Sequence, residues 1–194
     1  MFRLGDFYEM FGDDAKTASK ILQIALTSRD KSKEEPVPMC GFPHFASETY
    51  ITKLIKAGHK VAICEQMEDA KEAKGTEKGI IQRDVVRVIT PGTHTPEHPK
   101  ENNYILSFFP DGKRNGIAAA DVSTGEFLIY ETAEPIEDEF SRFEPKEILY
   151  PDSLRQNIHY SESLKDFYST AYEDWAFDYA EAYKILLMHF KVSS

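Results

Sequence analysis

The stretch from residue 91 to residue 99 divides this 194-residue chain into two parts. It contains three prolines, a glycine and two histidines, and it lacks large apolar side chains. Proline removes a backbone donor and glycine adds conformational freedom, so such a stretch ends helices and strands. Each flanking part is long enough to bury its own core. We therefore expect one domain at residues 1–95, a linker at 96–103 and a second domain at 104–194.

The two parts differ in charge. Residues 1–100 carry 15 Lys and Arg and 15 Asp and Glu, whereas residues 101–194 carry 8 and 18, which accounts for the whole net charge of −10. An acidic surface repels a nucleic-acid backbone, while a neutral part can still gather its basic side chains on one face. Any contact with nucleic acid is therefore expected in the first part, and the second part is better suited to contacting protein.

Several classes of protein are disfavoured. No apolar run approaches the roughly 20 residues that cross a bilayer, and the first residues lack the layout of a secretory signal. Cys40 and Cys64 are far apart, and reduced thiols are more typical of such a chain than a disulfide. His94 and His98 have the spacing of a helical metal pair, but Pro96 lies between them. We expect a cytoplasmic protein with no membrane contact and no metal site.

In the first part, apolar residues recur at helical spacing in two places, and two short runs are rich in β-branched residues. Asp13 or Asp14 is expected to cap the first helix. The expected elements are helices at residues 15–25 and 47–57 and strands at residues 61–64 and 85–89.

In the second part, strand-like runs alternate with turn residues such as Gly112 and Gly125. The expected elements are strands at residues 104–109, 116–122, 126–130 and 147–150 and helices at residues 136–143 and 179–189. This mixture places the chain in the α/β class, with helices packed on mixed sheets.

Near the N-terminus, Phe7, Tyr8 and Glu9 form a segment whose chemistry depends on its exposure. In a strand, alternate side chains point the same way, about 6.5–7 Å apart, so Phe7 and Glu9 project together and Tyr8 faces away. An exposed ring beside a carboxylate suits a site that stacks on a nucleic-acid base and meets its edge. These residues alone leave a second interpretation open, in which Phe7 belongs to the core and Glu9 lies at the strand's edge.

The residues around this segment extend it into a series of motifs. They are Gly5-Asp6-Phe7-Tyr8-Glu9-Met10-Phe11, Asp14-Ala15, Leu26-Thr27-Ser28-Arg29, Pro38-Met39-Cys40-Gly41-Phe42-Pro43-His44, Val61-Ala62-Ile63-Cys64-Glu65-Gln66-Met67-Glu68-Asp69 and Arg83-Asp84-Val85-Val86-Arg87-Val88-Ile89-Thr90-Pro91-Gly92-Thr93. In order and spacing these motifs resemble the opening of the bacterial MutS family. The resemblance implies a mixed-sheet mismatch-recognition domain. Residues 116–130 resemble the start of the family's connector domain, so part of a ribonuclease-H-like domain is expected to follow.

The resemblance implies roles for two residues of the segment Phe7-Tyr8-Glu9, which we call the probing segment. Phe7 matches an aromatic wedge that enters the minor groove and stacks on a mispaired or unpaired base. Glu9 matches a carboxylate that contacts the same base. As an anion Glu9 accepts a hydrogen bond from the base, and the alternative is that it carries a proton itself.

The resemblance also places the segment after Thr27 along the DNA. It implies a phosphate contact for Arg29 and packing near a sugar or base edge for Met39. For Lys31 and Lys33, a DNA contact and an ordinary solvated loop are both open. Residues 65, 66 and 69 are interpreted as the start of a helix after a strand, with a structural role only.

Two other functions stay open. In one, the chain is a docking or regulatory module that never touches DNA. In the other, the ribonuclease-H-like part is a metal-dependent nuclease in which Asp121 and Glu126 hold the ion. Against the nuclease, residues 121–125 have good turn chemistry. The resemblance also implies a connector that is no nuclease but passes signals between domains and binds MutL.

The sequence contains no Gly-x-x-x-x-Gly-Lys-Ser/Thr motif, since Gly112-Lys113 is followed by Arg114. The resemblance implies that ATP and Mg²⁺ binding, the lever and clamp regions and the homodimer belong to the full-length family protein. We therefore expect a fragment, with family residues before its start, that is not an enzyme and holds no cofactor. Its expected partners are mismatched double-stranded DNA, bound by the first domain, and MutL, bound by the connector. When bound to DNA, the protein is expected on the bacterial nucleoid.

Overall fold

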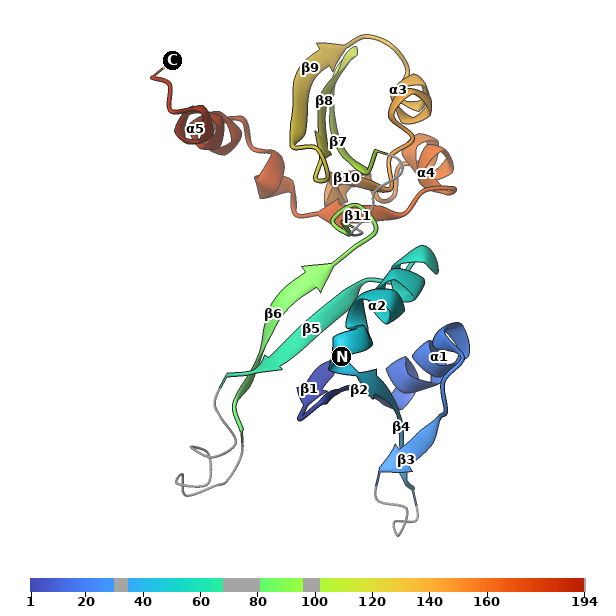
Figure 1. Cartoon of the computed structure of the whole chain (residues 1–194). Coiled ribbons are helices and arrows are strands. Elements are labelled where there is room, and N and C mark those ends of the chain that lie inside the picture. Colours follow the sequence, from blue (N-terminus) through green and yellow to red (C-terminus); the bar gives the residue numbers. More distant parts are fainter. Residues whose placement is uncertain (30–34, 68–80, 96–101, 194) are drawn as a thin grey trace. The chain divides into compact units, whose positions relative to one another are not determined.

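The computed structural model describes residues 1–29, 35–67, 81–95 and 102–193. Contacts divide the chain into two compact units, Met1–Pro96 and Glu97–Ser194. Each unit has its own sheet and its own buried apolar cluster, and each is described by itself (Figure 1). Two mixed sheets with helices packed on them confirm the α/β class. None of the helices in the described ranges is long and apolar enough to span a membrane.

The first unit is built on a six-stranded sheet with the strand order β3-β4-β2-β1-β5-β6. The strands are β1 (Phe2–Leu4), β2 (Phe7–Phe11), β3 (Thr27–Arg29), β4 (Val37–Pro43), β5 (Val61–Gln66) and β6 (Arg83–Ile89). Neighbouring strands are antiparallel except β1 and β5, which run parallel. β1 and β2 therefore form a hairpin in the middle of the sheet, with β5 on one side and β4 on the other.

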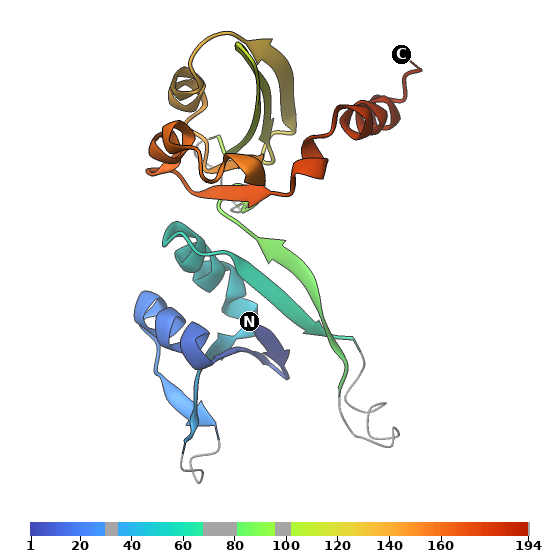
Figure 2. The ribbon, with the colours of Figure 1, turned by 180° about the vertical axis from the view of Figure 1, so that it is seen from behind.

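Two helices, α1 (Gly12–Leu22) and α2 (Ser47–Lys56), cover one face of this sheet (Figures 1 and 2). Each buries an apolar stripe with helical spacing. The buried apolar side chains are Ala15, Ala18 and Leu22 in α1 and Ile51, Leu54 and Ile55 in α2. All six form one cluster with Tyr8, Met10, Cys40 and Phe42 of the sheet, so both helices lie on the same face. The opposite face carries the alternate residues of each strand.

The ends of these elements correct three expectations. α1 ends at Leu22 because Gln23 adopts the left-handed conformation, with φ of 57°. The N-cap position of α1 is Phe11, without a side-chain cap, so the expected cap by Asp13 or Asp14 is wrong. These carboxylates lie in the first turn instead, where the helix dipole favours negative charge. Residues 65 and 66 are the last of β5, so the helix start expected at them is also wrong, and residue 69 of the same expectation lies outside the described residues.

The second unit is built on a five-stranded sheet with the strand order β11-β10-β7-β8-β9. The strands are β7 (Tyr104–Asp111), β8 (Arg114–Asp121), β9 (Glu126–Thr132), β10 (Glu147–Pro151) and β11 (Ser169–Tyr172). β7, β8 and β9 form the antiparallel meander predicted from their turn residues. Gly112 and Gly125 take positive φ values of 63° and 79° at the two turns, which glycine adopts without strain. β10 and β11 extend the sheet as parallel strands beyond β7.

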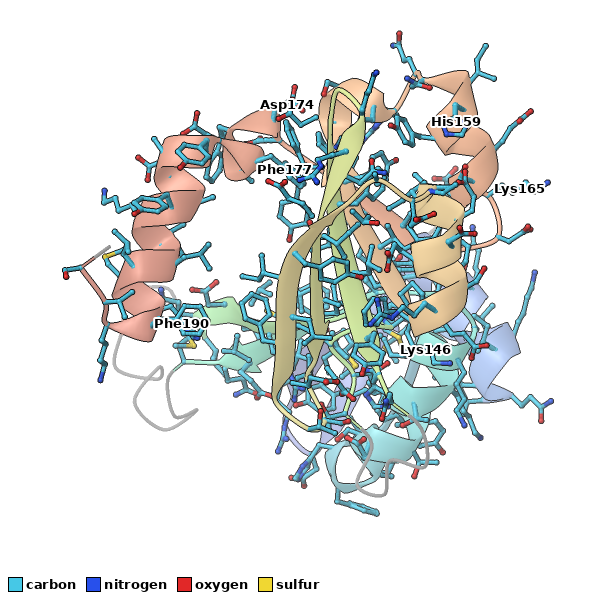
Figure 3. The ribbon with its side chains drawn as sticks, turned by 90° about the horizontal axis from the view of Figure 1, so that it is seen from above. Lys146, His159, Lys165, Asp174, Phe177 and Phe190 are labelled. Carbon is cyan, nitrogen blue, oxygen red and sulfur yellow. The ribbon has the colours of Figure 1, made fainter. Side chains whose placement is uncertain are left out.

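Helices lie on both sides of the second sheet. α3 (Ile136–Phe143) and α4 (Ile158–Leu164) pack on one face, where Phe108 contacts Phe140 and Tyr160 with ring centroids 5.8 Å and 5.5 Å apart. The adjacent residue Phe109 faces the other way and stacks on Phe177 of the short turn η4 (Asp174–Phe177) at 6.0 Å. α5 (Tyr179–Phe190) lies on that second side, as Phe177 and Phe190 show in Figure 3.

Phe42→Ala is expected to destabilise the first unit by about 3–5 kcal/mol, the usual cost of truncating a buried phenylalanine. The ring is 1% exposed, stacks on Tyr50 at 4.3 Å and contacts Tyr8. Hydrogen exchange of the β2 and β4 amides measures the change within this unit alone. Phe45→Ala is the matched control: its ring is 83% exposed, and protection should change by less than about 0.5 kcal/mol. Equal losses in both variants would contradict the core described here.

Candidate nucleic-acid interface

Phe7 and Glu9 lie on the β1–β2 hairpin, which turns at Gly5 and Asp6. Gly5 has a positive φ of 60°, so the tight turn suits glycine. Along β2 the side chains alternate: Tyr8 is 7% exposed and packs with the helices, whereas Phe7 is 46% exposed. Glu9, two residues after Phe7, projects from the same face. The shared face predicted for Phe7 and Glu9 is confirmed, and the interpretation of Phe7 as a core residue is wrong.

The face that carries Phe7 and Glu9 is largely apolar. Residues paired across the sheet point the same way, and those paired with odd-numbered residues of β2 are Phe2 and Leu4 in β1 and Met39, Gly41 and Pro43 in β4. Phe11, at the end of β2, contacts Phe2 with ring centroids 6.1 Å apart. Among all these residues only Glu9 is ionisable. Next to Phe7 the surface can therefore offer a ring to the flat side of a base and the Glu9 carboxylate to its edge.

Tyr8 fastens the hairpin to β5 from the opposite face. Its hydroxyl donates a hydrogen bond to Oε1 of Glu65, and the Arg3 guanidinium lies 5.7 Å from the centre of its ring. Burial, reinforced by the bond to Glu65, raises the pKa of the Tyr8 hydroxyl above its usual value of 10.0. The hydroxyl therefore keeps its proton at neutral pH and remains a donor. Because Tyr8 separates Phe7 from Glu9, this bond fixes the strand between them.

The turn of the hairpin is held from two sides. The Gly5 N–H donates to Oε1 of Gln66 at 3.0 Å, and the His44 N–H donates to the carbonyl oxygen of Asp6 at 2.8 Å. Gln66 ends β5, and His44 begins the short turn η1 (His44–Ala46) that follows β4. The tip of the hairpin thus receives one hydrogen-bonding partner from the end of β5 and one from η1, directly after β4.

Sequence reasoning missed Glu65, Gln66 and His44 as supports of the hairpin. Glu65 and Gln66 lie 57 and 61 residues from their partners, so no local pattern marks their side chains as engaged. The available signal was that all three belong to the motifs at residues 38–44 and 61–69 that accompany the probing segment.

The structure describes two of the four other residues predicted to contact DNA. Met39 is half-buried in β4, paired with Phe11 and Thr27, and so shares the face of Phe7. Arg29 ends the edge strand β3, where it pairs with Val37. Lys31 and Lys33 lie outside the described residues. DNA contacts by these four residues stay predictions.

In the second unit, Asp121 ends β8 and is 1% exposed. Its Oδ1 accepts hydrogen bonds from the N–H and the hydroxyl of Ser123 at 2.8 Å and 2.6 Å. Burial raises the pKa of this carboxyl, but these hydrogen bonds outweigh burial and hold it below its usual value of 3.8. Glu126, opposite Asp121, accepts a hydrogen bond from the Tyr104 hydroxyl. In the described ranges no three His, Cys, Asp or Glu gather as a metal site. The geometry is that of a turn.

Gln66→Leu is expected to speed amide exchange at Gly5 about fivefold, because the loss of one hydrogen bond is worth about 1 kcal/mol. NMR-detected hydrogen exchange measures the rate. Gln82→Leu is the control, since Gln82 is exposed and its contact with the Met67 N–H runs through the backbone carbonyl, which the substitution keeps. An unchanged Gly5 rate in Gln66→Leu would show that β5 does not hold the turn.

The lowered pKa of Asp121 predicts an acid-sensitive second unit. Because the folded value lies below 3.8, the carboxylate contributes stability that is present above about pH 4 and is lost as the pH falls through the folded pKa. Asp121→Asn is expected to lower the free energy of unfolding at pH 7 and to flatten its decline below about pH 4. Denaturant unfolding from pH 3 to 7 measures this, with the exposed Asp111→Asn as control. Identical acid slopes in the two variants would refute the assignment.

Two family models match the chain in succession. One, described as MutS domain I, matches residues 1–98, and the other, described as MutS domain II, matches residues 103–194. The first match contains the hairpin with Phe7 and Glu9, and the second contains the β7–β9 meander.

Relatives named DNA mismatch repair protein MutS match most or all of the chain. The relative from Thermodesulfovibrio yellowstonii is 56% identical over 193 residues, covering 100% of this chain and 22% of the relative. Relatives from Staphylococcus carnosus and Clostridium perfringens are 49% and 50% identical, covering 89% and 81% of this chain and 19% and 18% of their own length. The chain thus spans about a fifth of the length of these relatives. It belongs to the MutS family of DNA mismatch-repair proteins and contains the family's domains I and II.

Proposed function

We propose that the first unit recognises mismatched or unpaired bases in duplex DNA, with Phe7 as the wedge and Glu9 as the group that contacts the displaced base. The observation that carries this proposal is the exposure of Phe7, a ring left 46% accessible beside a half-buried carboxylate. Burying a phenylalanine side chain fully is worth about 1.5–3 kcal/mol, so a ligand that covers this ring gains stability. Membership of the MutS family supports a DNA mismatch as that ligand.

The wedge distinguishes DNA sites by how easily they deform. Inserting a ring between base pairs unstacks a step, which costs a few kcal/mol in a matched duplex. A mismatch has already lost part of its pairing and stacking energy, so the same insertion costs less there. A single ring can therefore find many different mismatches. Glu9 then bonds to the base edge, either as an anion that accepts a hydrogen bond or with a proton that it donates.

The supports of the hairpin suit this role. A wedge must resist being pushed back by the base stack, so its strand has to be held in place. Tyr8 is tied to Glu65, and Gly5 is tied to Gln66, both on β5. The ring of Phe7 therefore projects from a strand that is fastened on either side of it.

Other parts of the chain complete the proposal. Arg29, Lys31 and Lys33 would neutralise phosphates and Met39 would pack near a sugar or base edge. The acidic second unit would dock MutL rather than DNA, since residues 101–194 carry the net charge of −10. ATP and Mg²⁺ binding and homodimerisation would belong to the whole protein, acting on the bacterial nucleoid.

The test uses a chimera in which this chain replaces the matching segment of the Thermodesulfovibrio yellowstonii relative, so that DNA contacts from other parts are kept. Fluorescence anisotropy measures affinity for a duplex with one mismatch and for its matched counterpart. Phe7→Ala is expected to remove about 1–3 kcal/mol of mismatch preference, the value of one base–aromatic stack. Affinity for the matched duplex should change little, because the ring stacks only on a displaced base.

Phe109→Ala is the matched control, because this ring in β7 is 43% exposed but belongs to the second unit. The mismatch preference should survive its removal. If the preference also survives Phe7→Ala, the proposal fails, and a protein-docking module without DNA contact becomes the better interpretation.

A further inference from the structure

Gly41 lies in β4, directly opposite Glu9 of β2. Glycine inside a strand weakens it, so its presence there calls for a physical reason. A positive φ is the reason at five other glycines, where the space around a Cβ is open: Gly5, Gly12, Gly58, Gly112 and Gly125. Gly116 in β8 has neither a positive φ nor a close neighbour. Gly41 is not among the residues with positive φ, so its backbone suits any amino acid. The reason at Gly41 is therefore space.

The space beside Gly41 is already filled. A Cβ at this position would lie 3.2 Å from Cγ of Glu9 and 2.8 Å from the carbonyl oxygen of Tyr8. Directly opposed residues normally keep their Cβ atoms about 4.5–5.5 Å apart. A side chain at residue 41 would therefore meet the β2 backbone at Tyr8 first, and it would also compete with Cγ of Glu9 for the same volume.

The other neighbour of Glu9 is bulky. Phe2 pairs with Glu9 from β1, and its ring contacts Phe11 farther along the same face. Glu9 thus stands between an aromatic ring on the β1 side and a position without a side chain on the β4 side. This asymmetry favours one direction for the carboxylate.

We propose that Gly41 is a positioning residue, whose missing side chain sets the direction in which Glu9 presents its carboxylate. The inference rests on the proposed function, since the direction matters only if Glu9 meets a base. Hydrogen bonds weaken steeply when their angle departs from linearity. A carboxylate turned away from β4 would still be present on the face but would miss the base edge.

A purely structural role for Gly41 has a different signature. A Cβ would press on the Tyr8 carbonyl oxygen and loosen the β2–β4 pair. Loosening weakens binding to matched and mismatched DNA alike, whether or not Glu9 is present. Positioning acts only through Glu9, so its effect disappears once Glu9 has been removed.

The experiment compares Gly41→Ala, Glu9→Ala and the double variant in the same chimera. Gly41→Ala is expected to lower the preference for mismatched over matched duplex about tenfold, as for one misplaced hydrogen bond to a charged group. In the Glu9→Ala background it should add less than about twofold. Gly116→Ala is the control, because a Cβ there meets the Phe109 carbonyl oxygen at an ordinary 3.6 Å. Equal loss of both affinities, or a full tenfold loss without Glu9, would overturn the positioning role.

A second measurement needs no variant. In the unchanged 194-residue chain, nuclear Overhauser effects are expected between the γ protons of Glu9 and the α protons of Gly41. Contacts from Glu9 to the Phe2 ring in their place would overturn the inference.

Different results would refute the wedge proposal and the positioning proposal. An unchanged preference in Phe7→Ala refutes the wedge, whereas loss in Phe7→Ala and Glu9→Ala with none in Gly41→Ala refutes positioning alone.

Discussion

The alternation of side chains along β2 determines which residues of the first unit enter its core and which lie on its outer face. Tyr8 and Met10 face the helices, where they are 7% and 5% exposed, and the hydroxyl of Tyr8 is tied to Glu65. With these side chains inside, Phe7 and Glu9 must lie outside, because a shift of one residue in register would exchange the two faces of the strand. The alternation that builds the core therefore also creates the face proposed to meet DNA. No loop or inserted segment is needed to expose the ring.

Helices and strands that are marked by a local pattern of apolar or turn residues were predictable from the sequence. α2 buries the stripe that its apolar spacing indicates, and the β7–β9 meander follows its turn residues. β4 was not expected, because Pro38 and Pro43 argue against a strand inside a sheet. It forms there because β2 and β3 pair with it from both sides, which is a property of the tertiary fold. α4 and β11 escaped prediction as well.

The candidate site was predictable in its centre and not in its surroundings. Strand alternation predicted that Phe7 and Glu9 share a face, but three residues cannot say which face is buried, and the surrounding motifs decided it. The role of Gln66, expected to begin a helix, was not predictable, because its contact with Gly5 depends on the parallel pairing of β1 with β5. The space beside Gly41 likewise exists only once the β2–β4 register is set.

The bond between Gly5 and Gln66 joins residues 61 positions apart. β1 and β2 are neighbours in the chain and can pair soon after they are made, since a hairpin forms within about 1–10 μs. Synthesis adds only about 5–20 residues per second, so the turn waits several seconds for β5 to leave the ribosome. The hairpin is thus translated before β5 but is held at its turn only once β5 has joined it. A fixed turn at Gly5 reports that β5 has taken its place beside β1.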